Sequence, residues 1–421
     1  MPEILSLIFA LLFAYLCWQR LDWGVMLIAL FLPTYVVRLK FGPLPTTLLE
    51  LLLLALFFSF ALHWLTNQRF KLNFNGWLPW LLLSIGSSAV AVFVAPNIWP
   101  ALGLWRAYIL EPVIFFLIFI NVIKKEAALK GIFNALGLSL LAISLVAIWQ
   151  KFSPEGLAGF WAIPNPFWAA AETRRVTSIY GFPNAVGLFA APIITLHFGL
   201  LIKAWRRWGS VGWHLLIIIS GSLALVLAVS EGAIIAAIAG SIVIGLALPR
   251  SRRTMATLAV GLTILTLSLP ATRDLIREKI FFKDQSGQLR LEIWQETWQL
   301  IKHRPILGAG LNGYQTAVAP WHQKDYIEIY LYPHNIFLNF WVELGLAGLI
   351  SILLIIGRAL LMLIRARSDL AMIILGVFIT WFIHGLVDVP YFKNDLSVLF
   401  WIMTASASLM FVINKKTPVP R

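Results

Sequence analysis

A polar loop passes into the longest apolar run of the chain at Tyr332-Pro333-His334-Asn335-Ile336-Phe337-Leu338-Asn339-Phe340-Trp341-Val342-Glu343-Leu344-Gly345-Leu346-Ala347-Gly348. Pro333 fixes its φ and lacks an N–H group, which suits the start of a helix. The Asn335 side chain can accept hydrogen bonds from first-turn N–H groups, which have no partner within the helix. We therefore expect a helix to begin at about His334, with this titratable side chain at its N-terminus.

Helical spacing assigns the residues of this stretch to faces. Residues three or four positions apart share a face, and one face would hold His334, Leu338, Trp341, Gly345 and Gly348. The two glycines on it would let a neighbouring helix approach closely. Glu343 falls on the opposite side and about 13 Å deeper, at ~1.5 Å of rise per residue, so we expect no acid–base pair between Glu343 and His334.

The composition is that of a polytopic membrane protein. Of 421 residues, 60% are hydrophobic and 12% are charged, and the mean hydropathy is +0.84, more than the core of a soluble domain requires. Apolar runs near the length of a membrane crossing cover residues 4–18, 23–37, 46–64, 76–95, 100–123, 128–149, 183–202, 212–229, 232–248, 254–270, 335–363, 370–387 and 396–413. We predict an all-α fold, a polytopic transmembrane helix bundle of about twelve spans that forms a single integral membrane domain over residues 1–421.

The basic residues indicate the orientation of this bundle. The net charge is +14 and the pI is near 10.0, but Lys and Arg gather in short clusters between the runs, as topology signals do, which argues against a nucleic-acid partner. Alternate connections hold Arg69/Lys71, Lys124/Lys125/Lys130, Lys203/Arg206/Arg207, Arg250/Arg252/Arg253, Arg358/Arg365/Arg367 and Lys415/Lys416. By the positive-inside rule these connections are cytoplasmic, and the long loops 151–182 and 271–333 face outward. Residues 1–40 fit one crossing and a partial hairpin, which would place both chain ends inside.

The sequence excludes several kinds of site. The single cysteine, Cys17, lies in an apolar run, which excludes an intrachain disulfide and a Cys-based zinc site. A phosphate-binding Gly-x-x-x-x-Gly-Lys-Ser/Thr loop, a dinucleotide fingerprint, His-Glu-x-x-His and Asp-x-Asp are all missing, so we expect no nucleotide site, no cofactor and no metal. Met1-Pro2-Glu3 lacks the basic start of a cleaved signal peptide, and we expect the first run to be retained.

The outer loop 271–333, inserted before the span that starts near His334, contains an amphipathic segment. In Gln288–Arg304, one side holds Leu289, Ile293, Thr297, Leu300 and Ile301, which predicts a helix lying on the outer leaflet. Trp294 and Trp298 suit the level of the lipid headgroups. Pro305 should end the helix, and Gly308-Ala309-Gly310 should form a flexible turn before Tyr314.

Arginines on the two outer loops are candidate phosphate ligands. Arg174 and Arg175 stand just before the run that begins at 183, and Arg290 lies in the amphipathic segment. Because a guanidinium fork matches phosphate oxygens, Arg175 and Arg290 could clamp a pyrophosphate and stabilise it as it leaves. The alternatives are headgroup binding or a misplaced topology signal, but positive-inside statistics disfavour outer arginines without a role.

Histidine suits proton transfer near neutral pH. His334 is therefore either a general base or hydrogen-bond orienter for a hydroxyl nucleophile, or an interfacial residue that only caps a helix.

Other polar residues inside or beside the runs are secondary candidates. Arg106 and Glu111 lie within a span, where charged residues face the bundle interior, either as a structural ion pair or as part of a site. His384 and Asp388 share a helical face near the outer end of their span and are candidates for the same pocket. Glu231 occupies a tight turn between two runs. The substrate-binding candidates are Arg174, Tyr180, Asn184, Trp294, Tyr314, Asn335, Arg106 and His384.

Three stretches together resemble the O-antigen ligase and O-antigen polymerase superfamily. They are His334-Asn335-x-x-Leu338-x-x-x-x-Glu343-x-Gly345-x-x-Gly348, Arg290-Leu291-Glu292-Ile293-Trp294 followed by Pro305-Ile306-Leu307-Gly308-Ala309-Gly310, and Arg175 leading to Gly181-Phe182-Pro183-Asn184. The His384-Gly385 stretch looks similar too, and the resemblance covers mainly residues 170–410. One departure is Ser230-Glu231-Gly232, where many members have Ser-Arg-Gly, so the charge at this position is reversed.

The resemblance implies a multi-pass glycosyltransferase of the bacterial cytoplasmic (inner) membrane, with its active site on the extracytoplasmic side. Such proteins move a glycan from undecaprenyl pyrophosphate to a hydroxyl on lipid A core, on a growing glycan or on a protein, without a nucleotide or an obligatory metal. Carried over to this chain, Arg175 and Arg290 would hold the pyrophosphate, and His334 would activate or orient the acceptor hydroxyl.

Two other classes of function stay open. A transporter or flippase of a lipid-linked or polyanionic envelope precursor would show inverted repeats and broken helices around a midplane site, and the sequence contains no convincing repeat. A structural scaffold would leave the outer arginines without a role. Within the transferase class, the sequence does not separate ligation from polymerisation or protein O-glycosylation.

Overall fold

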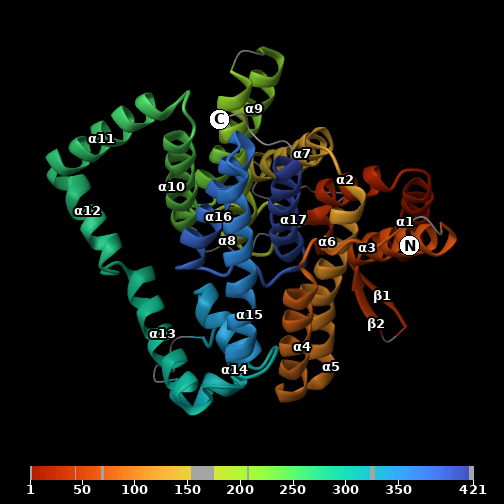
Figure 1. Ribbon diagram of the computed structural model, residues 1–421. Helices are drawn as coiled ribbons and strands as arrows, with labels where there is room; N and C mark the ends of the chain where they lie inside the picture. Colours follow the sequence, from red (N-terminus) through yellow and green to blue (C-terminus); the bar gives the residue numbers. More distant parts are fainter. Residues whose placement is uncertain are drawn as a thin grey trace.

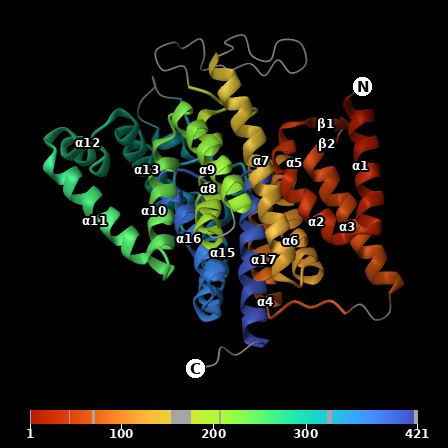
Figure 2. The same ribbon diagram turned by 90° about the horizontal axis from the view of Figure 1, so that it is seen from above.

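The computed structural model describes residues 2–42, 44–67, 71–152, 175–205, 208–322 and 328–416. These residues form a helical bundle (Figures 1 and 2). Its first part contains α1 (Pro2–Gln19), α2 (Leu21–Leu30), the 3-10 helix η1 (Leu32–Val36), β1 (Arg38–Phe41), β2 (Leu44–Thr47), α3 (Leu48–Thr66), α4 (Leu78–Val94), α5 (Ile98–Trp105), the π-helix η2 (Arg106–Leu110), α6 (Glu111–Val122) and α7 (Glu126–Phe152). Its second part contains α8 (Pro183–Ala204), α9 (Trp208–Leu227), α10 (Glu231–Ala247), α11 (Arg252–Ser268), α12 (Pro270–Ile280), α13 (Gln285–His303), α14 (Tyr314–Val318), the 3-10 helix η3 (Ala319–Trp321), α15 (Ile336–Ala366), α16 (Asp369–Gly385) and α17 (Asn394–Lys416).

Every apolar run predicted from the sequence corresponds to helical structure. Among the described residues, seven helical units are long and apolar enough to cross a membrane: α3, the continuous α5–η2–α6 unit, α7, α8, α9, α15 and α17. The shorter apolar helices α1, α2, α4, α10 and α16 accompany them. The protein is thus an all-α membrane protein in its spanning part, and the number of about twelve spans stays a prediction.

Residues 38–47 form a hairpin that the sequence analysis did not predict. β1 pairs antiparallel with β2, from Arg38 opposite Thr47 to Phe41 opposite Leu44. Thr47 then caps α3, since its side chain accepts from Glu50 N. The run predicted at 23–37 accordingly ends early, as the ten-residue α2 followed by η1.

The direction of α1 also differs from the prediction. Ser59 Oγ donates to Ala14 O and His63 Nε2 contacts Trp18 O, so that α1 and α3 run parallel. α3 begins beside the start of α17, where Asn394 Nδ2 donates to Glu50 Oε1 (2.7 Å). The start of α1 and the end of α17 therefore lie at opposite ends of the bundle (Figure 2). The expectation that both chain ends lie on one side is wrong, because α2 and η1 return the chain between two parallel helices.

The centre of the bundle is built from α8, α16 and α17. α8 packs against α9, α10 and α16, while α17 packs against α6 and α15. Aromatic side chains fill the interior, and the rings of Phe116 and Trp401 lie 4.9 Å apart between centroids. This packing fixes the two short turns 228–230 and 386–393, which link α9 to α10 and α16 to α17.

The long helix α15 is broken at Gly345, which has φ 71° and ψ 178°. The backbone groups at the break bond to the segment that follows α13: Ala309 N donates to Val342 O (2.6 Å), and Leu346 N donates to Ile306 O (2.9 Å). A Cβ at Gly345 would lie 2.5 Å from Ile306 O. The glycine therefore admits a loop, and the predicted close approach of a neighbouring helix is wrong at this position.

α11 and α12 form an arm that stands off from the bundle (Figure 1), and α13 brings the chain back to pack against α14 and α15. No described residue of α11 is buried. The amphipathic helix predicted at Gln288–Arg304 is α13, which buries Ile293, Thr297, Leu300 and Ile301 and leaves Leu289 half-buried. The predicted helix and its apolar side are confirmed, and that side packs within the protein; the position of the helix on the outer leaflet stays a prediction.

Candidate functional site

His334 precedes α15 and does not start it. Its φ is +48°, in the left-handed region, and Asn335 is the N-cap. Asn335 Oδ1 accepts from Phe337 N (3.0 Å) and Leu338 N (3.1 Å), as the sequence predicted. The expectation that His334 is the first helical residue is wrong, because the cap excludes it from the helix and from the face that holds Leu338.

His334 faces a carboxylate from a distant part of the chain. Its Nδ1 lies 3.4 Å from Oδ1 of Asp388, and the two side chains are 16% and 3% exposed. This separation is longer than a typical hydrogen bond and corresponds to an ion-pair contact. Because Asp388 faces Nδ1, we assign the imidazole hydrogen to Nδ1, which leaves Nε2 as the basic nitrogen.

Asp388 is held as a carboxylate although it is buried. Burial by itself raises its pKa, but the interaction with His334, helped by the charge of His384, outweighs that effect and brings the pKa to about 2. Asp388 Oδ1 also accepts a hydrogen bond from Val389 N (2.8 Å). The negative charge opposite His334 is therefore present at neutral pH.

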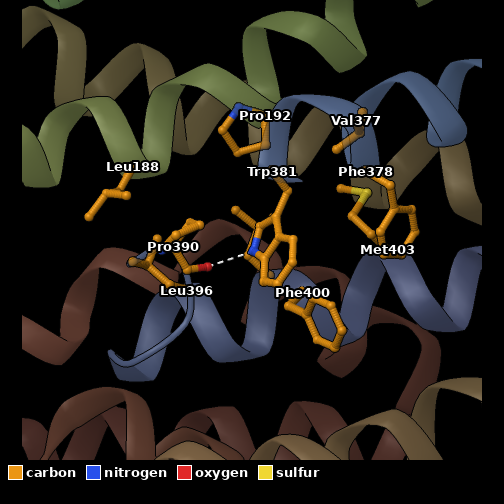
Figure 3. Close-up of a pocket in the computed structure, with 10 residues that line it drawn as sticks. Leu188, Pro192, Val377, Phe378, Trp381, Pro390, Leu396, Phe400 and Met403 are labelled. Carbon is orange, nitrogen blue, oxygen red and sulfur yellow. Dashed lines mark hydrogen bonds between the residues drawn. The ribbon is translucent and has the colours of Figure 1, made fainter. Parts of the chain in front are cut away.

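The 386–393 turn that carries Asp388 is tied to three elements. Trp381 Nε1 donates to Pro390 O (2.7 Å) beside an apolar hollow between α8, α16 and α17 (Figure 3). Asn335 Nδ2 donates to Leu386 O (3.1 Å), and Arg290 Nε donates to Val387 O (2.9 Å). Consecutive residues of one turn, 387 and 388, thus bring together the side chains of Arg290 and His334.

α13 supports the His334 loop as well as carrying Arg290. Trp294, one turn after Arg290, donates from Nε1 to Pro333 O (2.9 Å). The rings of Tyr330 and Tyr332 lie against the His334 ring, with centroids 5.3 and 4.9 Å away. Trp294 therefore bonds within the protein at this position, whereas Trp298 is 46% exposed.

Arg175 precedes α8, and its side chain reaches the turn 228–230 between α9 and α10. Its Nε donates to Ala228 O (2.9 Å), and its Nη2 donates to Asn184 Oδ1 (2.9 Å) and Val229 O (3.2 Å). Burial lowers the pKa of Arg175, and the charge of Glu231 opposes that shift. A guanidinium stays cationic under such conditions, since its ordinary pKa is far above neutral. The other predicted arginine, Arg174, lies outside the described residues.

The two turns touch through Gly232. A Cβ at Gly232 would lie 2.9 Å from Val387 Cγ2 and 3.6 Å from His384 Cδ2, and His384 itself is buried. Arg175, Arg290 and His334 therefore gather at one end of the bundle. We call it the histidine end, and define it by His334 and the turns 228–230 and 386–393. That the three side chains line a single outward-facing cavity stays a prediction.

Two predicted substrate-binding tyrosines are buried in this structure. Tyr314 is 2% exposed, and its hydroxyl shares a hydrogen bond with Thr297 Oγ1 (2.8 Å). Tyr180 is 1% exposed and stacks on Tyr35, with centroids 6.1 Å apart. These surroundings favour supporting roles for both.

Arg106 belongs to a polar network inside the bundle. It pairs with Glu50 (2.5 Å) and with Glu111 (3.2 Å). Glu50 also accepts from Asn394 Nδ2 (2.7 Å), so the network joins α3, η2, α6 and the start of α17. The ion pair with Glu111 is the structural alternative considered from the sequence, and Glu50 is the partner that the sequence did not indicate.

The sequence analysis placed Asp388 beside His384 but did not pair it with His334. It also missed Lys393 in the same turn, whose pKa is lowered by burial and held up by Asp395 and Asp388, and Lys279 of α12, which pairs with Glu231 (2.6 Å). The sequence did contain a signal for the residues of this turn: the short connection 388–395 holds three charged residues, Asp388, Lys393 and Asp395. Among the described residues, no three His, Cys, Asp or Glu side chains gather as metal ligands would.

Residues 214–353 match a protein-family model described as O-antigen ligase. No curated protein matches the chain. The matched region runs from α9 past the break in α15 and contains Arg290 and His334. Arg175, Asn184 and Asp388 lie outside it, so their place in the site rests on the contacts described above.

Proposed function

We propose that the chain, of which residues 214–353 match the O-antigen ligase family model, transfers a glycan from undecaprenyl pyrophosphate to an acceptor hydroxyl at the outer face of the cytoplasmic membrane. The family match by itself supports a membrane glycan ligase or polymerase. The observation that carries the finer proposal is the 386–393 turn, which binds Arg290 through Val387 O and faces His334 with Asp388. A cation beside a proton acceptor suits transfer from a pyrophosphate.

In the proposed reaction, Arg175 and Arg290 bind the pyrophosphate. Hydrogen bonds to backbone carbonyls hold both guanidinium groups in place, and Arg175 also donates to the Asn184 amide oxygen. The bond between the anomeric carbon and the phosphate oxygen breaks, and undecaprenyl pyrophosphate leaves with the bonding electrons. Fixed cations in a partly buried site stabilise this developing charge.

His334 acts on the acceptor. The acceptor hydroxyl oxygen forms the new bond to the anomeric carbon, and its proton passes to Nε2 of His334. Asp388 stabilises the resulting imidazolium through the ion-pair contact at Nδ1. The proton then passes to solvent as the product leaves. Ligation to lipid A core, extension of a glycan and glycosylation of a protein share this step and differ in the acceptor.

Glycan transfer in proteoliposomes tests the proposal. Wild-type protein receives an undecaprenyl-pyrophosphate-linked oligosaccharide and a panel of acceptors, and the products are resolved by mass. We expect His334→Ala to lower the transfer rate by about a hundredfold or more, as the loss of a general base does. His303→Ala is the matched control, because His303 is exposed and contacts Gln299 O of its own helix.

Three outcomes are informative. Loss of transfer in His334→Ala but not in His303→Ala supports the mechanism, and the product mass distinguishes ligation from chain extension. Transfer at the wild-type rate by His334→Ala contradicts the role of the histidine. Donor that crosses the bilayer unchanged replaces the transferase with a transporter or flippase.

A further inference from the structure

A polar cavity lies at the end of the bundle opposite the histidine end. Its volume is about 630 Å³, and its charged and hydrogen-bonding lining includes Lys130, Asn134, Lys203, His214, Arg250 and Asp369. Asn184 and Lys203 lie near the two ends of the 22-residue helix α8, which are about 30 Å apart at ~1.5 Å per residue. The cavity is therefore separate from the candidate pyrophosphate site.

The charge of the lining is predominantly positive. Lys130, Lys203 and Arg250 face a single lining carboxylate, Asp369. Lys203 is offset by Glu126, which contacts its Nζ at 2.8 Å, whereas Lys130 and Arg250 are exposed side chains. An anion that enters the cavity therefore meets a surplus of cations.

Hydrogen-bond donors accompany this charge. Asn134 Oδ1 accepts from Trp213 Nε1 (3.1 Å), which orients the amide and leaves the Nδ2 hydrogens for an acceptor. Its side chain is exposed and lines the cavity. An acceptor-rich ligand such as a phosphate matches this arrangement.

His214 lines the cavity, and its contact with His197 determines which of its ring nitrogens carries a hydrogen. His197 Nε2 lies 3.1 Å from Phe133 O, and a carbonyl is an acceptor, so Nε2 carries the hydrogen of a neutral His197. Its Nδ1 then accepts from Nδ1–H of His214, 3.0 Å away. This leaves Nε2 of His214 as an acceptor for a hydroxyl group, such as that of a headgroup glycerol or a protonated phosphate.

We propose that this cavity binds a phosphate-bearing anion, with Lys130, Lys203 and Arg250 supplying charge and Asn134 supplying hydrogen bonds. Its volume falls in the range of small-ligand sites. Basic pockets between transmembrane helices on the cytoplasmic side take anionic lipid headgroups, and the positive-inside rule puts this end on that side. A lipid headgroup and a free phosphate share the required chemistry, and the proposal does not depend on the transferase reaction.

Native mass spectrometry of the purified, delipidated full-length protein tests the proposal. The protein is titrated separately with cardiolipin, with phosphatidylcholine and with inorganic phosphate. We expect a phosphate-bearing anion to bind wild type and to bind the Lys130→Gln/Arg250→Gln variant at least about tenfold more weakly. Lys125→Gln/Arg365→Gln is the control, since it removes the same charge from exposed positions outside the cavity lining. Circular dichroism and gel filtration verify that both variants fold.

The outcomes separate the sources of the anion. Cardiolipin binding that is lost in the cavity variant and kept in the control assigns the site to a lipid headgroup. Inorganic phosphate binding with the same pattern, without retained cardiolipin, assigns it to a soluble phosphate. Equal loss in both variants, binding of phosphatidylcholine as strong as that of cardiolipin, or no binding of either anion overturns the proposal.

Discussion

At the scale of single residues, the site depends on a charge that burial alone would remove. A carboxyl group as buried as Asp388 ordinarily favours its neutral form. The adjacent His334 reverses this preference and holds the pKa of Asp388 at about 2. In return, the carboxylate determines which imidazole nitrogen of His334 faces away from it and takes up a proton.

The stability of the protein should depend on pH through Asp388. Its folded-state pKa of about 2 lies below the ~3.9 of an unfolded chain, so the folded state favours the carboxylate and is stabilised by it above about pH 4. That contribution is lost as the pH falls from about 4 to about 2. Asp388→Asn removes it, so the difference in stability between wild type and variant should be largest at neutral pH and shrink below about pH 4. Thermal unfolding in detergent over this pH range measures the difference.

Asp274→Asn serves as the control for that experiment. Asp274 is 66% exposed on α12, and a solvated side chain contributes little to stability. Its substitution should leave the unfolding temperature near the wild-type value at each pH. A constant gap between wild type and Asp388→Asn from neutral pH down to about 2 would show that Asp388 contributes through packing and not through its charge.

At the scale of elements, α15 explains why Glu343 and Gly345 stand close together in the stretch 332–348. The break at Gly345 opens α15 to the segment after α13, and Glu343 accepts a hydrogen bond from Asn312 N (2.6 Å) in the same segment. Trp341 Nε1 donates to Pro305 O (2.7 Å). α15 thus binds the segment that follows α13. α13 itself bonds to Val387 and Pro333 beside His334.

We predict that Gly345→Ala destabilises the protein by about 2 kcal/mol or more, because its backbone conformation is one that only glycine adopts readily. The added methyl group would also lie 2.5 Å from Ile306 O. Gly357→Ala in the same helix is the matched control, since a Cβ added there would meet no neighbouring segment within 4 Å. It should be neutral or stabilising by up to about 1 kcal/mol. Chemical denaturation in detergent compares the two, and equal stabilities would contradict the proposed strain.

At the scale of the whole molecule, the bundle separates two charged ends. The histidine end holds Arg175, Arg290 and His334, and the other end holds the cavity with Lys130 and Arg250. Short basic clusters mark that second end and the connections beside it, as expected for the cytoplasmic side. A reaction on a lipid-linked donor would then be placed across the membrane from the phosphate-binding cavity.

This orientation predicts the accessibility of single cysteines. In a Cys17→Ala background, Gln295→Cys on the exposed side of α13 should react with a membrane-impermeant maleimide in intact spheroplasts. Arg365→Cys, near the end of α15, should react only after permeabilisation. The reverse labelling pattern would invert the orientation and exclude an outward-facing site.

The helices, the cap at Asn335 and the apolar side of α13 could be predicted from the sequence alone. Each of these follows from local physics: the length of an apolar run, the hydrogen-bonding needs of a first turn and the helical repeat. The resemblance also singled out Arg175, Arg290 and His334, which the structure brings to one end of the bundle.

Three features depend on contacts between distant segments: which carboxylate faces His334, which groups bond to the backbone at the break in α15, and which way α1 runs. In a bundle of similar apolar helices, hydropathy does not specify which helices are neighbours, because most pairings bury the same kind of surface. Specific partners such as Asp388, Val387 O and Ile306 O are selected by packing and by the need of every buried polar group for a hydrogen bond. The site therefore depends on contacts between segments that are distant in the sequence and adjacent only in the folded chain.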